Sequence, residues 1–168
     1  ADGRALHDVL AGARLPEHIT TTDADALAAT LQPLPHREYS IASLPSEGQL
    51  QLLLRRQTHP DGTPGLASGW LCDHASLGEH IDLRLRENRN FHPPATDAPL
   101  LLIGNGTGIA GLRAHLRARI DAGARRNWLL FGERHRAHDF HFGDELEQWQ
   151  REGWIERLDT VFSRDGQT

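Results

Sequence analysis

The sequence predicts an α/β protein whose second half, residues 95–168, contains a parallel sheet. Three apolar runs have the composition of buried strands and lie at 99–103, 128–131 and 154–162. Two segments with helical periodicity separate these runs and lie at 109–122 and 139–152. A strand–helix–strand–helix–strand order within about 65 residues is typical of parallel strands joined by right-handed crossovers.

The helix predicted over 109–122 has one apolar stripe, formed by Ile109, Leu112, Leu116 and Ile120, and Gly123 is expected to end it. The arginines in and after this helix are expected to form a solvated face; they are Arg113, Arg117, Arg119, Arg125 and Arg126. The four tryptophans are expected in the core; they are Trp70, Trp128, Trp149 and Trp154.

The first half of the chain has a mixed pattern. Short helices are expected within 3–32, where Leu6, Val9 and Leu10 share a face and Thr22-Asp23 precedes a helix over 24–31. Short strands are expected at 39–43, 50–54 and 81–86, with turns at 45–48 and 59–65 and a helix within 68–77. Pro93-Pro94 predicts a domain boundary.

Composition excludes several kinds of chemistry. All 18 basic residues are Arg, so the chain offers no Schiff-base or P-loop lysine. Cys72 is the single cysteine, which excludes an intrachain disulfide and a cysteine-rich zinc site. The formal charge of -5 gives no reason to expect a nucleic-acid partner. The chain lacks Met, a signal peptide and a long apolar run, and we expect a cytoplasmic or cytosol-facing piece of a longer protein.

A glycine loop at 104–108 follows the first buried strand and precedes a helix. Glycines allow a diphosphate to approach the backbone, and the helix start attracts negative charge. A plain strand-to-helix turn is the alternative. Ile109 occupies the third glycine position of the usual dinucleotide motif. The second strand is followed by residues 133–136, and we expect none of them to supply the carboxylate that binds the ribose of NAD. A dinucleotide with a phosphorylated ribose is therefore favoured over NAD.

Ser163 and Arg164 end the third strand at the same edge of the sheet as the glycine loop. Arg and Ser at this place can bind a 2'-phosphate by charge-assisted hydrogen bonds, whereas a solvated turn is the alternative. In the first half, Arg37 and Tyr39 lie on one side of an extended segment, and residues 65–68 precede a helical stretch as a second candidate phosphate nest.

Six segments together resemble the ferredoxin–NADP reductase superfamily, most closely its diflavin branch, which includes the sulfite reductase flavoprotein and NADPH–cytochrome reductases. The segments that carry the resemblance are 37–43, 65–71, 90–93, 103–110, 127–132 and 162–165. The resemblance implies a partial antiparallel FAD-binding barrel over 36–94, with a helical insert over 1–35, followed by a parallel α/β NADP-binding domain over 95–168. It also implies that the chain is truncated at both ends.

The resemblance assigns cofactor contacts residue by residue. FAD would contact Arg37, Tyr39, Ser40, Gly65, Leu66, Ala67 and Ser68, with Tyr39 stacked on the flavin ring and Arg37 on the diphosphate. NADP would contact Gly104, Gly106, Thr107, Gly108, Ser163 and Arg164, the last two at the 2'-phosphate. No catalytic acid or base and no metal ligand is implied, because the redox chemistry belongs to the cofactors.

The implied activity is that of an NADPH-dependent flavoprotein oxidoreductase, passing electrons through FAD to FMN in a flavodoxin-like partner domain or to another one-electron acceptor. A non-catalytic nucleotide-binding or interaction module with the same fold is the alternative, and a conventional NAD dehydrogenase domain is a third reading. The spacing of His135, His138 and His141 is compatible with metal ligands, but a polar loop is the favoured interpretation.

Overall fold

A computed structural model describes residues 13–14 and 23–166, and contacts divide the chain into two units, 1–38 and 39–168. In the first unit, β1 (Ala13–Arg14) pairs antiparallel with β2 (Gln32–Pro33). Helix α2 spans Ala24–Thr30, and the Asp23 carboxylate caps it by accepting a bond from the Asp25 N–H at 3.1 Å. The predicted cap is thus confirmed. Of the range 3–22, where helices were expected, residues 13–14 form strand β1 instead, and the rest lies outside the described residues. The boundaries after residues 35 and 94 stay predictions.

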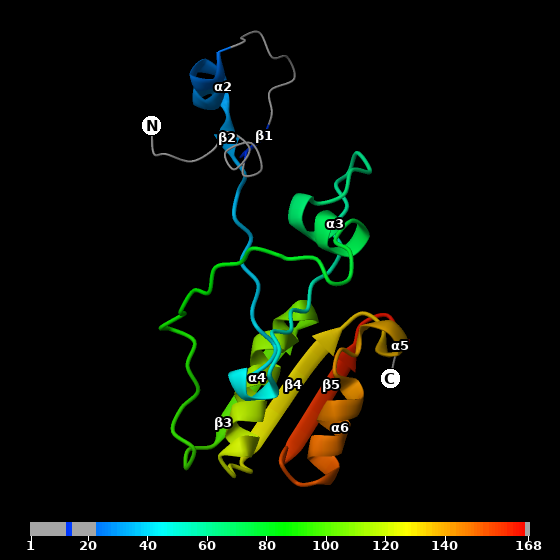
Figure 1. Cartoon of the computed structure of the whole chain (residues 1–168). Coiled ribbons are helices and arrows are strands. Elements are labelled where there is room, and N and C mark those ends of the chain that lie inside the picture. The colour runs from blue at the N-terminus through cyan, green and yellow to red at the C-terminus, as the bar shows by residue number, and fades with distance from the viewer. Residues whose placement is uncertain (1–12, 15–22, 167–168) are drawn as a thin grey trace. The chain divides into compact units, whose positions relative to one another are not determined.

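The second unit is built on a parallel three-stranded sheet (Figure 1). Its strands are β3 (Leu100–Asn105), β4 (Asn127–Glu133) and β5 (Arg157–Phe162), in that spatial order. The crossover between β3 and β4 contains helix α4 (Ile109–Asp121), and α5 (Arg136–Asp139) and α6 (Gly143–Arg151) lie between β4 and β5. The parallel α/β prediction for this half is confirmed.

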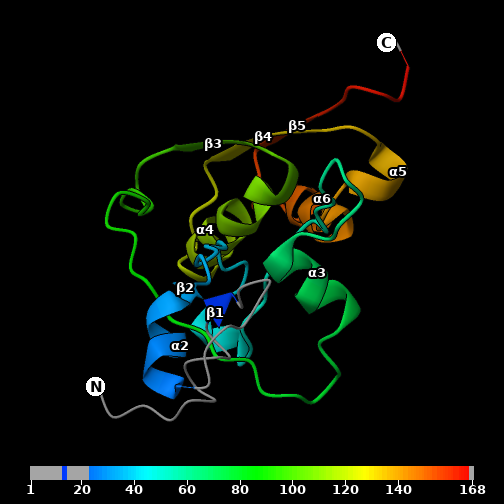
Figure 2. The same ribbon diagram turned by 90° about the horizontal axis from the view of Figure 1, so that it is seen from above.

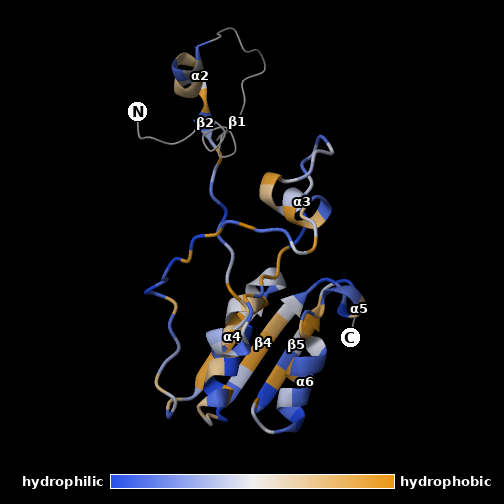
Figure 3. Ribbon diagram, in the orientation of Figure 1, coloured by the Kyte–Doolittle hydropathy of each residue, from blue (hydrophilic) through white to orange (hydrophobic). Residues whose placement is uncertain are grey.

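Helices α4 and α6 cover the same face of the sheet (Figure 2). Two right-handed crossovers that step in the same direction place their helices on one side. The core beneath them is formed by Leu102, Ile109, Leu112, Leu116, Leu129, Phe131, Leu146, Trp149 and Ile155. Figure 3 shows hydrophobic colours along the strands and hydrophilic colours on the outer side of α6.

The opposite face of the sheet was expected to be buried as well, and within the described part of the chain it is not. Leu101 and Ile103 are 51% and 64% exposed on this face, and Trp128 and Val161 also lie open. The expectation that all four tryptophans lie in the core is therefore wrong, since only Trp149 is fully buried and Trp70 is exposed. An apolar run predicts that a strand will be buried, but the layer that buries it must be supplied by another helix or strand.

The expected solvated arginine face is wrong at two positions. Arg113 is 5% exposed and Arg119 is 2% exposed. Arg119 donates to Asn127 Oδ1 at 2.6 Å and to the carbonyls of Ala98 and Ala95 at 2.7 and 3.2 Å. A guanidinium can be buried when acceptors meet its N–H groups, and here residues distant in sequence supply them.

Residues 39–99 form little regular structure. The turns at 45–48 and 59–65 are confirmed, the first as a short helix η1 (Pro45–Glu47), and the helix expected within 68–77 is α3 (Leu66–Asp73). The strands expected at 39–43 and 50–54 are reduced to one bridge, Ile41 to Leu52. The strand expected at 81–86 is absent, and its alternating Ile81, Leu83 and Leu85 are exposed, because no described element covers them. No helix among the described residues is long and apolar enough to cross a membrane.

Candidate functional site

The glycine loop occupies the carboxyl end of β3, as the sequence predicted. It forms a short helix η2 (Gly106–Gly108) that continues into α4. Gly106 has a φ of +55°, in the left-handed region where glycine is favoured. A Cβ built on Gly104 would lie 2.6 Å from Leu112 Cδ1, whereas a Cβ on Gly108 would meet nothing within 4 Å. The loop therefore combines close strand–helix packing at Gly104 with open space at Gly108, where a ligand can approach.

The ends of β4 and β5 lie next to each other at this same edge of the sheet. The Ser163 N–H donates to the Glu133 carbonyl at 2.9 Å, and the Arg164 N–H donates to the Arg134 carbonyl at 2.9 Å. Both arginines are exposed, so two guanidinium groups can reach an anion at this edge. The sequence predicts a site at Arg164 and assigns none to Arg134, although Arg134 also lies just beyond the end of a strand.

Glu133 is the last residue of β4, so an acidic residue does end the second strand, while the expected lack of a ribose carboxylate stays a prediction. Its side chain is only 5% exposed and forms an ion pair with the Arg55 guanidinium. The other carboxylate oxygen accepts a bond from the Arg134 N–H at 2.6 Å. Glu133 Oε1 lies 3.1 Å from the position of a Cβ on Gly106, so this carboxylate borders the glycine loop. Because Arg55 neutralises Glu133, the carboxylate is neither free for a ribose nor an unpaired negative charge beside a phosphate.

A second polar cluster lies behind the loop. Ligand-type atoms of Glu133, Asp139 and His141 lie within 4.8 Å of one another, and His141 Nε2 is buried without a hydrogen-bond partner. Arg55 Nη2 forms an ion pair with Glu133 and also lies 3.8 Å from Asp139 Oδ1. The Arg55 guanidinium therefore supplies the positive charge next to both carboxylates.

The three histidines at 135, 138 and 141 do not act together. His135 Nδ1 contacts Asp165 Oδ1 at 3.0 Å and its ring packs edge-on against His138, whereas His141 belongs to the cluster with Glu133. Asp165 also accepts the Arg136 N–H at 2.6 Å, and this backbone bond, with His135, lowers the pKa of the Asp165 carboxyl.

The residues assigned to FAD are only partly brought to the nucleotide loop. Ser40 lies against the first turn of α4, since a Cβ on Gly111 would be 3.4 Å from Ser40 Cβ and 3.0 Å from Phe91 Cε1. Tyr39 precedes it and is half-buried. Arg37 belongs to the unit 1–38, and its described bond is to the neighbouring His36 carbonyl at 3.4 Å.

The second FAD segment, Gly65 to Ser68, forms the start of α3. Ser68 is buried, and its hydroxyl accepts a bond from the Gln57 N–H at 3.0 Å. Gly65 packs closely there, because an added Cβ would lie 2.8 Å from Gln57 Cβ. Leu66 is exposed and Ala67 is half-buried. The Ser68 oxygen thus has an internal partner, and the roles of all these residues toward FAD stay predictions.

Comparison with known proteins agrees with the sheet and loop. Residues 102–166 match the oxidoreductase NAD-binding domain family. The flavoprotein alpha-component of NADPH sulfite reductase from Yersinia enterocolitica is 38% identical over 152 residues, covering 85% of this chain and 25% of that protein. The Klebsiella pneumoniae protein of the same name is 36% identical over 152 residues, covering 86% of this chain and 25% of that one.

A crystal structure of the Amycolatopsis cytochrome P450 reductase GcoB is also similar, with a TM-score of 0.57 and 28% identity over 78% of this chain and 39% of that one. The chain spans about a quarter of the length of the curated relatives. The parallel sheet, the glycine loop and these similarities agree with the resemblance seen in the motifs: the chain is similar to proteins of the diflavin branch of the ferredoxin–NADP reductase superfamily, and its residues 102–166 match the oxidoreductase NAD-binding domain family.

Proposed function

We propose that this chain is an NADPH- and FAD-binding module of a diflavin-type oxidoreductase. When bound, FAD would supply the redox chemistry: it would take a hydride from NADPH, leaving NADP⁺, and would then pass the two electrons one at a time to FMN or another one-electron acceptor. The partner would be a flavodoxin-like FMN domain, and the protein would act in the cytoplasm or on the cytosolic face of a membrane. The similarity to the sulfite reductase flavoproteins and to a P450 reductase supports this proposal.

The observation that carries the proposal is the shared edge of the sheet. It holds the glycine loop at the end of β3 and Ser163-Arg164 at the end of β5. Gly106 and Gly108 would leave room for the diphosphate, and Thr107 would add a hydroxyl donor. Arg164 would bind the 2'-phosphate through charge-assisted hydrogen bonds, with Ser163 beside it.

The flavin would lie on the other side of the same loop. Ser40 contacts the first turn of α4 at Gly111, three residues beyond Gly108, so Tyr39 and Ser40 would present the flavin ring toward the nicotinamide. The start of α3 at Gly65 to Ser68 would bind the FAD diphosphate, and Arg37, which belongs to the unit 1–38, is assigned to the diphosphate by the resemblance alone. No acid or base of this chain is needed, because its residues bind and orient the cofactors.

One observation favours the alternative of a non-catalytic nucleotide-binding module. Within residues 39–94 the structure has two isolated bridges, Ile41 to Leu52 and Thr58 to Pro64, in place of the strands of a partial FAD barrel. In this alternative the sheet edge with the glycine loop and Ser163-Arg164 still binds the nucleotide, but the chain does not bind FAD. The two functions therefore differ in FAD binding.

Calorimetric titrations of the chain with NADP⁺ and NAD⁺, and a fluorescence titration with FAD, test the proposal. We expect NADP⁺ to bind more tightly than NAD⁺, and Arg164→Ala to weaken NADP⁺ binding about 10- to 100-fold while sparing NAD⁺, since hydrogen bonds to charged groups contribute about 1.5–3 kcal/mol. Arg151→Ala is the control, because Arg151 is exposed at the far end of α6. Equal losses for both nucleotides would overturn the 2'-phosphate assignment, and nucleotide binding without FAD binding would support the alternative.

A further inference from the structure

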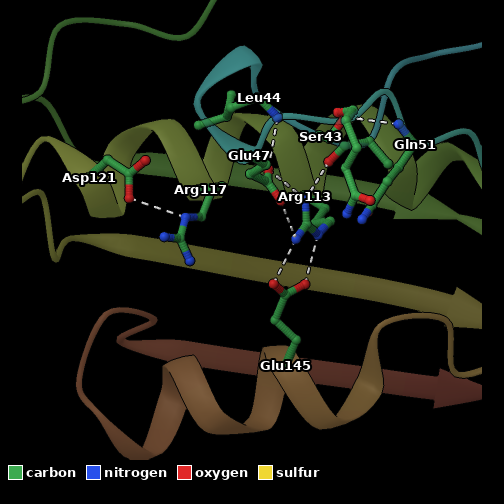
Figure 4. A network of polar contacts seen from close by, with 10 residues as sticks. Ser43, Leu44, Glu47, Gln51, Arg113, Arg117, Asp121 and Glu145 are labelled. Atoms are coloured by element: carbon green, nitrogen blue, oxygen red, sulfur yellow. Dashed lines mark hydrogen bonds and ion pairs between the residues drawn. The ribbon is translucent and has the colours of Figure 1, made fainter.

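Arg113 uses every N–H of its guanidinium in one buried network (Figure 4). Nε and Nη2 donate to the two oxygens of Glu145, both at 2.7 Å. Nη1 and Nη2 donate to the two oxygens of Glu47, at 3.1 and 3.0 Å, and Nη1 also donates to the Ala42 carbonyl at 2.7 Å. Five N–H groups thus meet five acceptors, which is the full capacity of an arginine.

The partners of Arg113 come from two different parts of the fold. Glu145 lies in the first turn of α6, the helix that packs on the sheet through Leu146 and Trp149. Ala42 and Glu47 belong to the otherwise irregular segment 39–47, which precedes and includes η1. Hydrogen bonding to Arg113 lowers the pKa of Glu47, so this carboxylate stays ionised in the network. Arg113 therefore joins segment 39–47 to α4, on which it lies, and to α6.

Segment 39–47 also makes hydrogen bonds within itself and to residues 49 and 51, close to where Arg113 contacts it. Ser43 Oγ donates to the Gln49 carbonyl at 2.8 Å and accepts the Gln51 N–H at 2.9 Å. Glu47 also accepts the Leu44 N–H at 2.7 Å, so its carboxylate fixes the turn as well as the guanidinium. If the Arg113 guanidinium moved, its bonds to Ala42 and Glu47 would consequently shift the whole of segment 39–47.

A second contact lies one half-turn earlier on α4. Gly111 faces Ser40 and Phe91, with an added Cβ 3.4 Å from Ser40 Cβ and 3.0 Å from Phe91 Cε1. Gly111 stands three residues after Gly108 of the nucleotide loop and two before Arg113. The two contacts together hold Ser40, which follows Tyr39 in the chain, against the first turn of α4 beside the glycine loop.

We propose that Arg113 is a positioning residue that fixes segment 39–47 on α4 and thereby sets the distance between the flavin ring and the nicotinamide. The inference rests on the proposed function for its redox consequence, but the anchoring itself concerns residues of this chain alone. Arg113→Lys removes the planar fork and at least two of the five donors, so it is expected to release the segment without removing the positive charge. Glu47→Gln is the milder variant, because it keeps the shape of the side chain but removes its charge and replaces one of its two acceptor oxygens with an NH2 group.

Hydrogen exchange of the chain without cofactors tests the anchoring. The amides of Ala42 and Gln51 should exchange about tenfold faster in both variants, while the amides of β4 keep their protection. Arg117→Lys is the matched control, because Arg117 lies one turn further along α4 in a half-exposed pair with Asp121. Unchanged exchange at Ala42 and Gln51 in both variants overturns the proposal.

Rapid-mixing reduction of the FAD-loaded chain by saturating NADPH tests the consequence. We expect the limiting rate to fall about 10- to 100-fold in Arg113→Lys, as a displacement near 1 Å can cause, while the dissociation constants of FAD and NADP⁺ change less than about threefold. Faster exchange with an unchanged limiting rate overturns the positioning role. Absence of FAD binding by the unaltered chain contradicts the proposed function instead, and with it this redox role, while the exchange measurement still decides whether Arg113 anchors the segment.

Discussion

Arg119→Met offers a quantitative test of how the structure uses a buried charge. Arg119 donates to the buried Asn127 Oδ1 at 2.6 Å and to the carbonyls of Ala98 and Ala95. Hydrogen bonds to charged groups contribute about 1.5–3 kcal/mol each, but the two carbonyls belong to accessible residues and can be hydrated in the variant. Only the Asn127 oxygen loses its partner without replacement.

We therefore expect Arg119→Met to lower the free energy of unfolding by about 3 kcal/mol, a large fraction of the ~5–15 kcal/mol typical of native proteins. Urea denaturation measures this as a lower midpoint at an unchanged slope. Arg117→Met on the same helix is the control and should lose at most about 1 kcal/mol, as for an exposed pair. A loss below about 1 kcal/mol for Arg119→Met would refute the reasoning, because the cost of burying the guanidinium would then offset its bonds.

Two further predictions concern the loop and the helix next to it. Gly104→Ala places a Cβ 2.6 Å from Leu112 Cδ1, and we expect a loss of about 1–3 kcal/mol in unfolding free energy; an unchanged urea midpoint would contradict the close packing. Burial, with a smaller repulsion from His92, lowers the pKa of His115 below its usual 6.5. The unfolded chain then binds the proton first, so stability is complete above about pH 6.5 and falls as the pH drops toward the folded pKa. His115→Gln should reduce the difference between urea midpoints measured at pH 7.5 and 5.5, and an unaltered difference would count against a buried, neutral imidazole.

Local sequence determined the second half of this protein to a large extent. The runs at 99–103 and 128–131 became strands, the segment 109–122 became α4, and the loop at 104–108 has the left-handed residue that its glycines predict. These features depend on periodicity and backbone freedom within a few residues, which a sequence displays directly.

Alternation alone was not sufficient in the first half. The apolar residues of 81–86 alternate as in a strand, yet no described strand pairs with them and they remain exposed. A strand needs hydrogen-bonding neighbours and a layer to cover it, and neither is encoded by the segment itself. The same reason explains why the described residues leave one face of the sheet of β3, β4 and β5 uncovered.

Only the tertiary structure decided which charges are buried and what they hold. Arg113 meets partners 71 and 32 positions away in the chain, and Arg55 reaches Glu133 across 78 positions. From the sequence, each of these arginines is a polar residue expected at the surface. Burial of a charge becomes favourable only when the fold delivers enough acceptors to one place, and that condition depends on distances that sequence neighbours do not set.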